Sequence, residues 1–276
     1  MTVIRAARAE ISKLLSTSTW WILALVLLLY VGSTSGGLAA VFAASATGSL
    51  PGEAASPALP EDAIPPLIYS LATAIGYVIP LLIGVLMVTT EFRHQTLTPT
   101  FLATPRRGAA LGGKLLAAVP VGALFGFVAV VASVLPGAIA LAAVGADAAL
   151  DQVDTWAMTA RMVLAFVLWV LIGVGVGALV RNQVAAIVIV LAFTQFVEPI
   201  GRTVSSFVEG VSNVTAFLPG AASDGLVGAS LYTSIPGMAA PEGLELAWWA
   251  SGLVLLGYAV VLVTLGHITS WRRDVA

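Results

Sequence analysis

Long stretches of apolar residues alternate with short polar segments along the whole chain. A helix that crosses a bilayer needs about 20 mostly apolar residues, and six stretches come close to that length or exceed it. They cover residues 20–46, 66–90, 112–143, 156–180, 184–203 and 246–270. The pattern predicts an all-α membrane protein with six transmembrane helices, forming one transmembrane domain over residues 1–276.

The third stretch is too long for one straight span and too short for two. Pro120 and Pro136 interrupt it, and only about nine uncharged residues follow Gly137 before Asp147. We therefore expect a single kinked or tilted helix. This choice decides on which side of the membrane every later segment lies.

The ends of the other stretches raise two further alternatives. Residues 3–15 place apolar side chains at helical spacing with Arg5 and Arg8 elsewhere on the wheel, which favours an amphipathic helix on the inner leaflet over a mere start of the first span. The first stretch is longer than a signal-peptide core of about 7–15 residues, which favours an uncleaved anchor. The half-apolar segment 201–245 suits short helices at the outer interface, or one that dips into the bundle.

The composition excludes most water-soluble classes of protein. Hydrophobic residues make up 59% of the chain, charged residues 9%, and the mean hydropathy is +1.02, whereas soluble domains carry roughly 25% charged residues. The chain has no cysteine, which excludes disulfides and thiolate zinc sites. Its two histidines, His94 and His267, lie far apart in the sequence. We expect no catalytic, cofactor-binding or metal-binding residue on this chain.

The distribution of basic residues predicts the orientation of the spans. With both termini in the cytoplasm, ten of the 12 Lys and Arg residues fall on the inner side, as the positive-inside rule requires. These ten are Arg5, Arg8, Lys13, Arg93, Arg106, Arg107, Lys114, Arg181, Arg272 and Arg273. Acidic residues show the opposite bias, since only Glu10, Glu91 and Asp274 of the 14 fall inside.

Charged residues within the spans are few and lie close to the predicted outer boundary. They are Arg161, Glu198 and Arg202. Glu198 and Arg202 have the spacing of a helical ion pair, although Pro199 and Gly201 between them predict an interruption of the helix. We favour an ion pair that stabilises the end of the fifth span over a pair of residues that contact the substrate. No span centre holds an Asp, Glu, Lys or His, which disfavours ion-coupled carriers.

A glycine-rich segment before the third span imitates a phosphate-binding loop. Residues 108–114 match the first seven positions of that motif, but Leu115 stands where a Ser or Thr should hold magnesium. We interpret the segment as the start of a membrane helix.

The inner loop between spans two and three has the most specific pattern. Thr98 and Pro99 suit the beginning of a short helix, and Pro105 suits its end. Such a helix would present Phe101 and Leu102 to a protein groove or, equally well on physical grounds, to the lipid.

This loop resembles that of the ABC-2 type transporter permeases. The resemblance lies in Glu-x-Arg-x-x-Thr followed by an apolar stretch, Pro, basic residues and a Lys before the next span. The matching residues are Glu91, Arg93, Thr96, Pro105, Arg106, Arg107 and Lys114. Gln95 departs from the pattern, because relatives often carry Gly before the Thr.

The resemblance implies a permease subunit that works as a dimer, with a second copy or a related permease, and with two ABC ATPase subunits that bind ATP and magnesium. The loop helix would then be the coupling helix, with Phe101 and Leu102 against the ATPase. We expect an exporter in the plasma membrane, neither an enzyme by itself nor a nucleic-acid binder. A secondary transporter and a membrane scaffold or assembly protein, both without an ATPase, are the alternatives.

Overall fold

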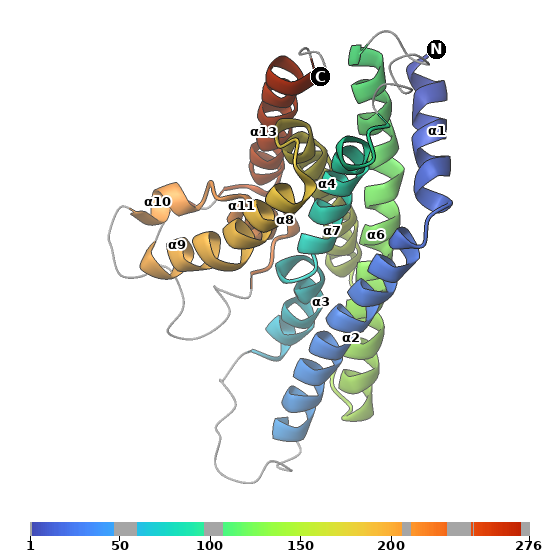
Figure 1. The fold of residues 1–276 in the computed structure, drawn as a ribbon. Helices are drawn as coiled ribbons and strands as arrows, with labels where there is room; N and C mark the ends of the chain where they lie inside the picture. Colours follow the sequence, from blue (N-terminus) through green and yellow to red (C-terminus); the bar gives the residue numbers. More distant parts are fainter. Residues whose placement is uncertain are drawn as a thin grey trace.

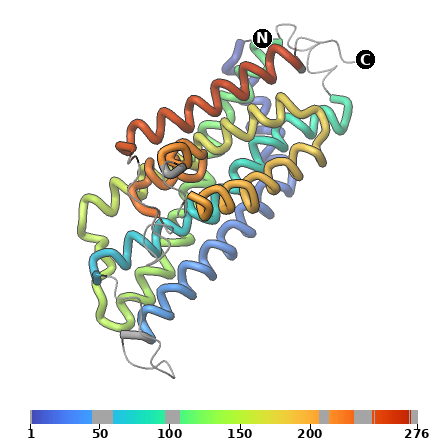
Figure 2. Tube along the Cα trace, turned by 90° about the vertical axis from the view of Figure 1, so that its left-hand side faces the viewer, coloured from blue at the N-terminus to red at the C-terminus, as the bar shows by residue number. Residues whose placement is uncertain are grey.

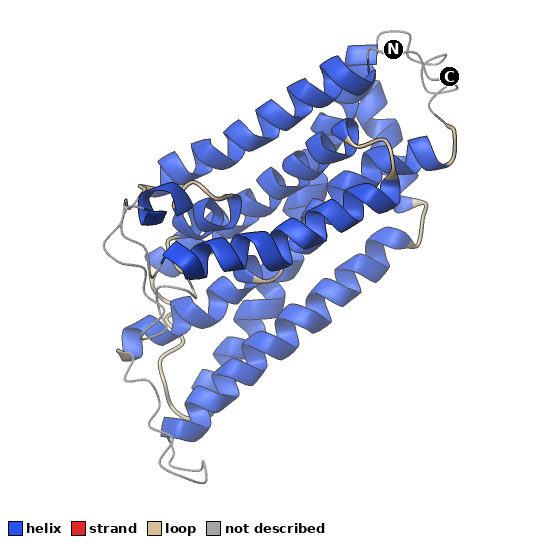
Figure 3. Cartoon of the chain, turned by 60° about the vertical axis from the view of Figure 1, so that its left-hand side comes forward, coloured by secondary structure: helices blue, strands red, loops and turns tan. Residues whose placement is uncertain are grey.

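The computed structural model describes residues 2–46, 60–96, 107–205, 211–230, 244 and 246–271. Within these residues all regular structure is helical, and six helical segments are long and apolar enough to span a membrane (Figures 1 and 3). These segments are Thr19–Ala44, Glu61–Arg93, Arg107–Ala143, Val153–Leu179, Gln183–Ser205 and Trp248–Thr269. The predicted all-helical architecture with six candidate spans is confirmed, and the chain has the character of a multi-pass membrane protein.

The N-terminal segment forms a helix of its own. Helix α1 (Val3–Leu15) ends at Ser16, and α2 (Thr19–Ala46) begins three residues later. The two buried residues of α1, Ala6 and Ala7, pack against the start of the third span. A Cβ on Gly113 there would lie 2.6 Å from the Cβ of Ala6. The separate amphipathic helix predicted from the sequence is therefore present, and small residues let it approach the bundle closely.

The second span is a broken helix, whereas the apolar pattern predicted a continuous one. A 3₁₀ turn, η1 (Glu61–Ala63), leads into α3 (Ile64–Ala74), and α4 (Val78–Arg93) follows after three non-helical residues. Gly76 lies in this break, and a Cβ there would sit 3.1 Å from the side chains of both Leu27 and Val31 on α2. Pro80 falls in the first turn of α4, where its missing N–H costs no hydrogen bond.

The third and fourth spans are continuous. Helix α6 (Arg107–Ala143) contains both Pro120 and Pro136, so the prediction of one long helix is confirmed. Helix α7 (Val153–Leu179) packs against α4, α6 and α13 and is the central element of the bundle. Its glycines permit this, since a Cβ on Gly173 would lie 2.1 Å from the Leu81 carbonyl oxygen.

The fifth span contains a π-helical turn. Helix α8 (Gln183–Ala192) passes through η2 (Phe193–Val197) into α9 (Glu198–Ser205). The prediction that Pro199 and Gly201 interrupt the helix is wrong, because α9 continues through both. Pro199 is the second residue of α9 and directly follows the π-helical turn η2, where the regular i→i−4 hydrogen-bond ladder is already interrupted.

The segment before the last span combines both of the predicted arrangements. The short helix α10 (Val211–Thr215) has an exposed Val214, whereas α11 (Pro219–Val227) is mostly buried. Helix α11 contacts α3, α7 and α13, so it dips into the bundle. The last span is α13 (Trp248–Gly266), which ends in a π-helical turn, η3 (His267–Trp271).

The two ends of the described chain lie at the same end of the bundle (Figures 1 and 2). The Arg107 side chain at the start of α6 donates a hydrogen bond to the Trp271 carbonyl oxygen, 3.2 Å away. Helix α1, the end of α4, the start of α6 and η3 therefore gather around one end, and this is the end that the charge distribution predicts to be cytoplasmic.

Candidate functional site

Four charged side chains from three helices meet where α1, α4 and α6 come together. Lys114 of α6 donates from Nζ to Glu10 Oε2 at 2.8 Å and lies 3.0 Å from Glu91 Oε1. Lys13 of α1 donates to the same Glu91 oxygen at 2.5 Å and lies 4.0 Å from Glu10 Oε2. We call Glu10, Lys13, Glu91 and Lys114 the four-charge network.

The network lies inside the protein. The side chain of Lys114 is 0% exposed, that of Glu91 1% and that of Glu10 14%, while Lys13 is 45% exposed at the edge. Lys114 Nζ also donates to the Met87 carbonyl oxygen at 3.0 Å, so it has three acceptors. Two cations and two anions balance, which is the condition under which buried charges are tolerated.

The network brackets the loop between the second and third spans. Glu91 lies in the last turn of α4 and Lys114 in the third turn of α6, so the two residues hold both stems of the loop together. Arg107 adds a second tie, to Trp271 of η3. The predicted loop residues Phe101, Leu102, Pro105 and Arg106 lie outside the described residues, and their roles stay predictions.

The two remaining loop residues named from the sequence are exposed. Arg93 ends α4, and Thr96 donates its backbone N–H to the Glu91 carbonyl oxygen at 3.0 Å. Between them Gln95 has a φ of 54°, in the left-handed region that glycine adopts at little cost. The backbone at position 95 therefore favours Gly.

The glycine-rich segment 108–114 is helical and does not have the geometry of a phosphate-binding loop. It belongs to the first turns of α6. Gly113 gives space to Ala6 of α1, and Lys114 pairs with carboxylates. Lys114 was predicted as part of a motif, but its partner Glu10 was not, nor was Lys13 as the second cation on Glu91. The opposite charges of Glu10 and Lys13, three residues apart on α1, were the available signal.

A second group of charges lies on the fifth span and α11. Arg202 donates from Nη2 to Asp224 Oδ2 at 2.8 Å, while its Nε lies 3.9 Å from Glu198 Oε1. Glu198 Oε1 accepts from the Ala221 backbone N–H at 3.1 Å, so it also caps the beginning of α11. The pair predicted from spacing is therefore the looser contact, and Asp224, which was not predicted, is the closer partner of Arg202.

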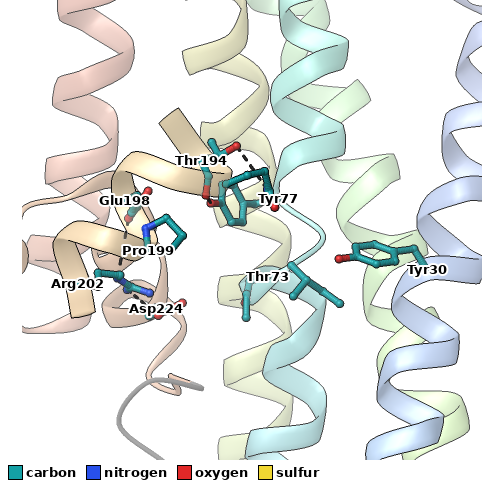
Figure 4. A pocket seen from close by; sticks show the side chains of 12 residues that line it. Tyr30, Thr73, Tyr77, Thr194, Glu198, Pro199, Arg202 and Asp224 are labelled. Carbon is teal, nitrogen blue, oxygen red and sulfur yellow. Dashed lines mark hydrogen bonds and ion pairs between the residues drawn. The ribbon is translucent and has the colours of Figure 1, made fainter. Parts of the chain in front are cut away.

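These charges border a polar cavity of about 140 Å³ (Figure 4). Hydroxyl groups from several helices line it as well, those of Tyr30, Thr73, Tyr77 and Thr194. Tyr30 comes from the middle of α2, and Thr73 and Tyr77 flank the break between α3 and α4. The cavity is thus placed along the length of the spans and not at an end of the bundle.

The aromatic wall of the cavity is held by packing. The Tyr77 ring stacks on Trp169 with centroids 4.5 Å apart, and its hydroxyl donates to the Thr194 carbonyl oxygen at 3.3 Å. Trp169 in turn donates from Nε1 to Ser223 Oγ of α11 at 3.1 Å. These contacts connect α4, α7, η2 and α11 around the cavity.

Within the part of the chain that the structure describes, no three His, Cys, Asp or Glu residues are grouped so as to hold a metal ion. No protein-family model matches this chain, and a search of curated protein sequences returned no match. The functional assignment therefore depends on the residues and their geometry.

Proposed function

We propose that this chain is the membrane-spanning permease subunit of an ATP-driven transporter of the ABC-2 type. In this proposal both termini are cytoplasmic, the subunit pairs with a second copy or a related permease in the plasma membrane, and ABC ATPase subunits bind the inner loop. Transport is outward. The chain itself holds no ATP, and hydrolysis takes place on the partner.

The observation that carries this proposal is the bracketing of the inner loop by the four-charge network. A loop transmits a conformational change of a bound partner to the spans only if the helix ends on both sides of the loop are rigidly connected. Glu91 and Lys114 join the two stems at 3.0 Å, and Glu10 and Lys13 join α1 to them. A buried network of this kind is strongly destabilised when one partner is removed, so α1, α4 and α6 should move as one body.

A secondary transporter without an ATPase has one observation in its favour. The cavity carries Glu198 and Asp224 beside Arg202 within the bundle, and carriers coupled to ions use such intramembrane groups. The two proposals differ in their energy source. Transport into inverted vesicles that needs ATP and survives collapse of the ion gradients supports the permease, and the reverse result supports the carrier.

The decisive experiment is recovery of an ABC ATPase with the tagged chain from its native membrane, followed by assay of ATP turnover. Burial of one large apolar side chain is worth roughly 1.5–3 kcal/mol. Phe101→Ser/Leu102→Ser should therefore weaken the complex about a hundredfold, since each 1.4 kcal/mol is tenfold. The matched control is Ile4→Ser/Leu15→Ser, which removes two exposed apolar side chains of α1 at the same end of the bundle.

Retention of the ATPase and of full turnover by the Phe101/Leu102 variant would show that the loop is not the coupling element, and its apolar residues would then be assigned to lipid. Glu91→Gln tests transmission separately, because it should lower turnover more than it lowers assembly. Cysteine labelling should reach both termini only from the cytoplasmic side. ATP hydrolysis by the chain alone, free of other subunits, would contradict the proposal.

A further inference from the structure

Two interruptions of regular helix meet at the cavity, and a third helix begins there. The break between α3 and α4, the π-helical turn η2 and the beginning of α11 all contribute lining residues. Irregular backbone at membrane depth is tolerated where it lines a cavity, and broken helices in transporters mark the binding site. Ordinary packing of six spans requires none of these interruptions, so their convergence on one cavity points to a ligand.

The charges at the cavity do not balance. Arg202 is the one cation among the described residues that line the cavity, and it contacts Asp224 at 2.8 Å. Glu198 is only 3% exposed, its Oε1 lies 3.9 Å from Arg202, and its Oε2 has no hydrogen-bond partner among the described residues. Two carboxylates therefore face one guanidinium in a buried place, where an unmatched carboxylate charge is expensive and a cationic ligand would balance it.

Other features of the cavity wall also favour a positive ligand. Thr73 and Ala74 are the last residues of α3 and line the cavity, so the negative end of that helix dipole faces it. The rings of Tyr30 and Tyr77 lie on the wall, and the faces of aromatic rings attract organic cations. Figure 4 shows Tyr30 on one side of the cavity and the Arg202–Asp224 pair on the other.

We infer that this cavity binds the ammonium group of an amine substrate, with Glu198 as its counter-charge. The volume of about 140 Å³ accommodates a head group, whereas pockets that enclose whole drug-sized ligands measure roughly 300–1,000 Å³. The apolar remainder of the substrate leaves the cavity past Tyr30, which is 48% exposed on the outer face of α2. This assignment of a substrate class rests on the proposed transport function, but binding by the chain alone tests it.

The test is calorimetric titration of the full-length chain, in lipid nanodiscs without any ATPase, with phenethylammonium and with its uncharged analogue 2-phenylethanol. The ammonium compound should bind at least about tenfold more tightly than the alcohol, a difference of about 1.4 kcal/mol. Glu198→Gln keeps an acceptor for the Ala221 N–H but removes the charge, and it should abolish this preference. Glu61→Gln, which removes an exposed carboxylate before α3, is the matched control and should retain it.

A second pair of variants covers the case in which Glu198→Gln does not fold. Tyr30→Leu should weaken binding of the ammonium compound several-fold, whereas Tyr30→Phe, which keeps the ring, should not. Equal binding of amine and alcohol, or unchanged binding by Glu198→Gln and Tyr30→Leu, would overturn the inference. Displacement of the amine by low concentrations of sodium would overturn it too, in favour of a metal-cation site. If amine binding persists while no ATPase is recovered, the proposed function fails and the binding site stands.

Discussion

The four-charge network and the cavity charges are both buried ion clusters, but they differ in charge balance. In the network two lysines and two glutamates pair at 2.5–3.0 Å, and Lys114 satisfies a backbone carbonyl as well, while Glu91 Oε2 accepts no hydrogen bond from the described residues. At the cavity one arginine serves two carboxylates, one of them at 3.9 Å. A cluster with balanced charges holds helices together, whereas a cluster with unbalanced charges beside a cavity favours binding of a ligand of opposite charge.

The largest effect should follow from removing the central cation of the network. Lys114→Met leaves Glu10 and Glu91 without their buried partner and should lower the free energy of unfolding by about 3–5 kcal/mol. Lys13→Met is the control, and because Lys13 is 45% exposed it should cost less than about 1 kcal/mol. Unfolding in mixed detergent–SDS micelles measures both. Equal losses of unfolding free energy in the two variants would show that the deeper burial of Lys114 does not make it more important for stability than Lys13.

Opening the network through packing should have a smaller effect. Gly113→Ala places a Cβ 2.6 Å from the Ala6 Cβ and should displace α1, at a cost of about 1–3 kcal/mol. Gly112→Ala is the matched control. Its Cβ would lie 3.6 Å from Val3, an ordinary contact, so the helix propensity of alanine should make it neutral or stabilising by up to about 1 kcal/mol. Protease access to α1 should rise only in the Gly113 variant.

The cavity cluster should tolerate loss of a charge better than the network does. Asp224→Asn keeps an acceptor for Arg202 and Ser230, which donate to Asp224 at 2.8 and 2.9 Å, and should cost about 1–2 kcal/mol of stability. Asp62→Asn, at an exposed position, should change nothing measurable. A loss for Asp224→Asn as large as that for Lys114→Met would remove the distinction between the two clusters.

The smallest effect concerns the backbone that follows Glu91. Gln95→Gly relieves a φ of 54° and should stabilise the protein by about 0.5–1 kcal/mol, the strain of a left-handed residue less the entropy cost of glycine. His94→Gly, at a neighbouring position with a φ of −95°, should destabilise it slightly. The measurement is the difference between the unfolding midpoints of the two variants. A lower midpoint for Gln95→Gly than for His94→Gly would contradict the left-handed backbone at position 95.

Hydrophobic length predicted the six spans and the unbroken α6, and the helical spacing of apolar residues predicted the separate α1, because each depends on local sequence. The ion clusters depend on contacts between residues far apart, such as Glu10 with Lys114, and on the rotation of each helix about its axis. Hydropathy carries little information on either. Asp224 was missed because α11 is too short and too polar to register as buried. The break in the second span had a local signal in Gly76 and Pro80, which the strong apolar pattern around them concealed.

The π-helical turn η2 determines which side of the following helix, α9, faces the rest of the bundle. Such a turn contains one residue more than an α-helical turn, and one residue corresponds to a rotation of about 100°. With a regular α-helical turn in place of η2, the side of α9 that carries Glu198 and Arg202 would turn away from α11. The lipid-facing side of α8 and the charged side of α9 are thus matched to different surroundings by a single residue within Phe193–Val197.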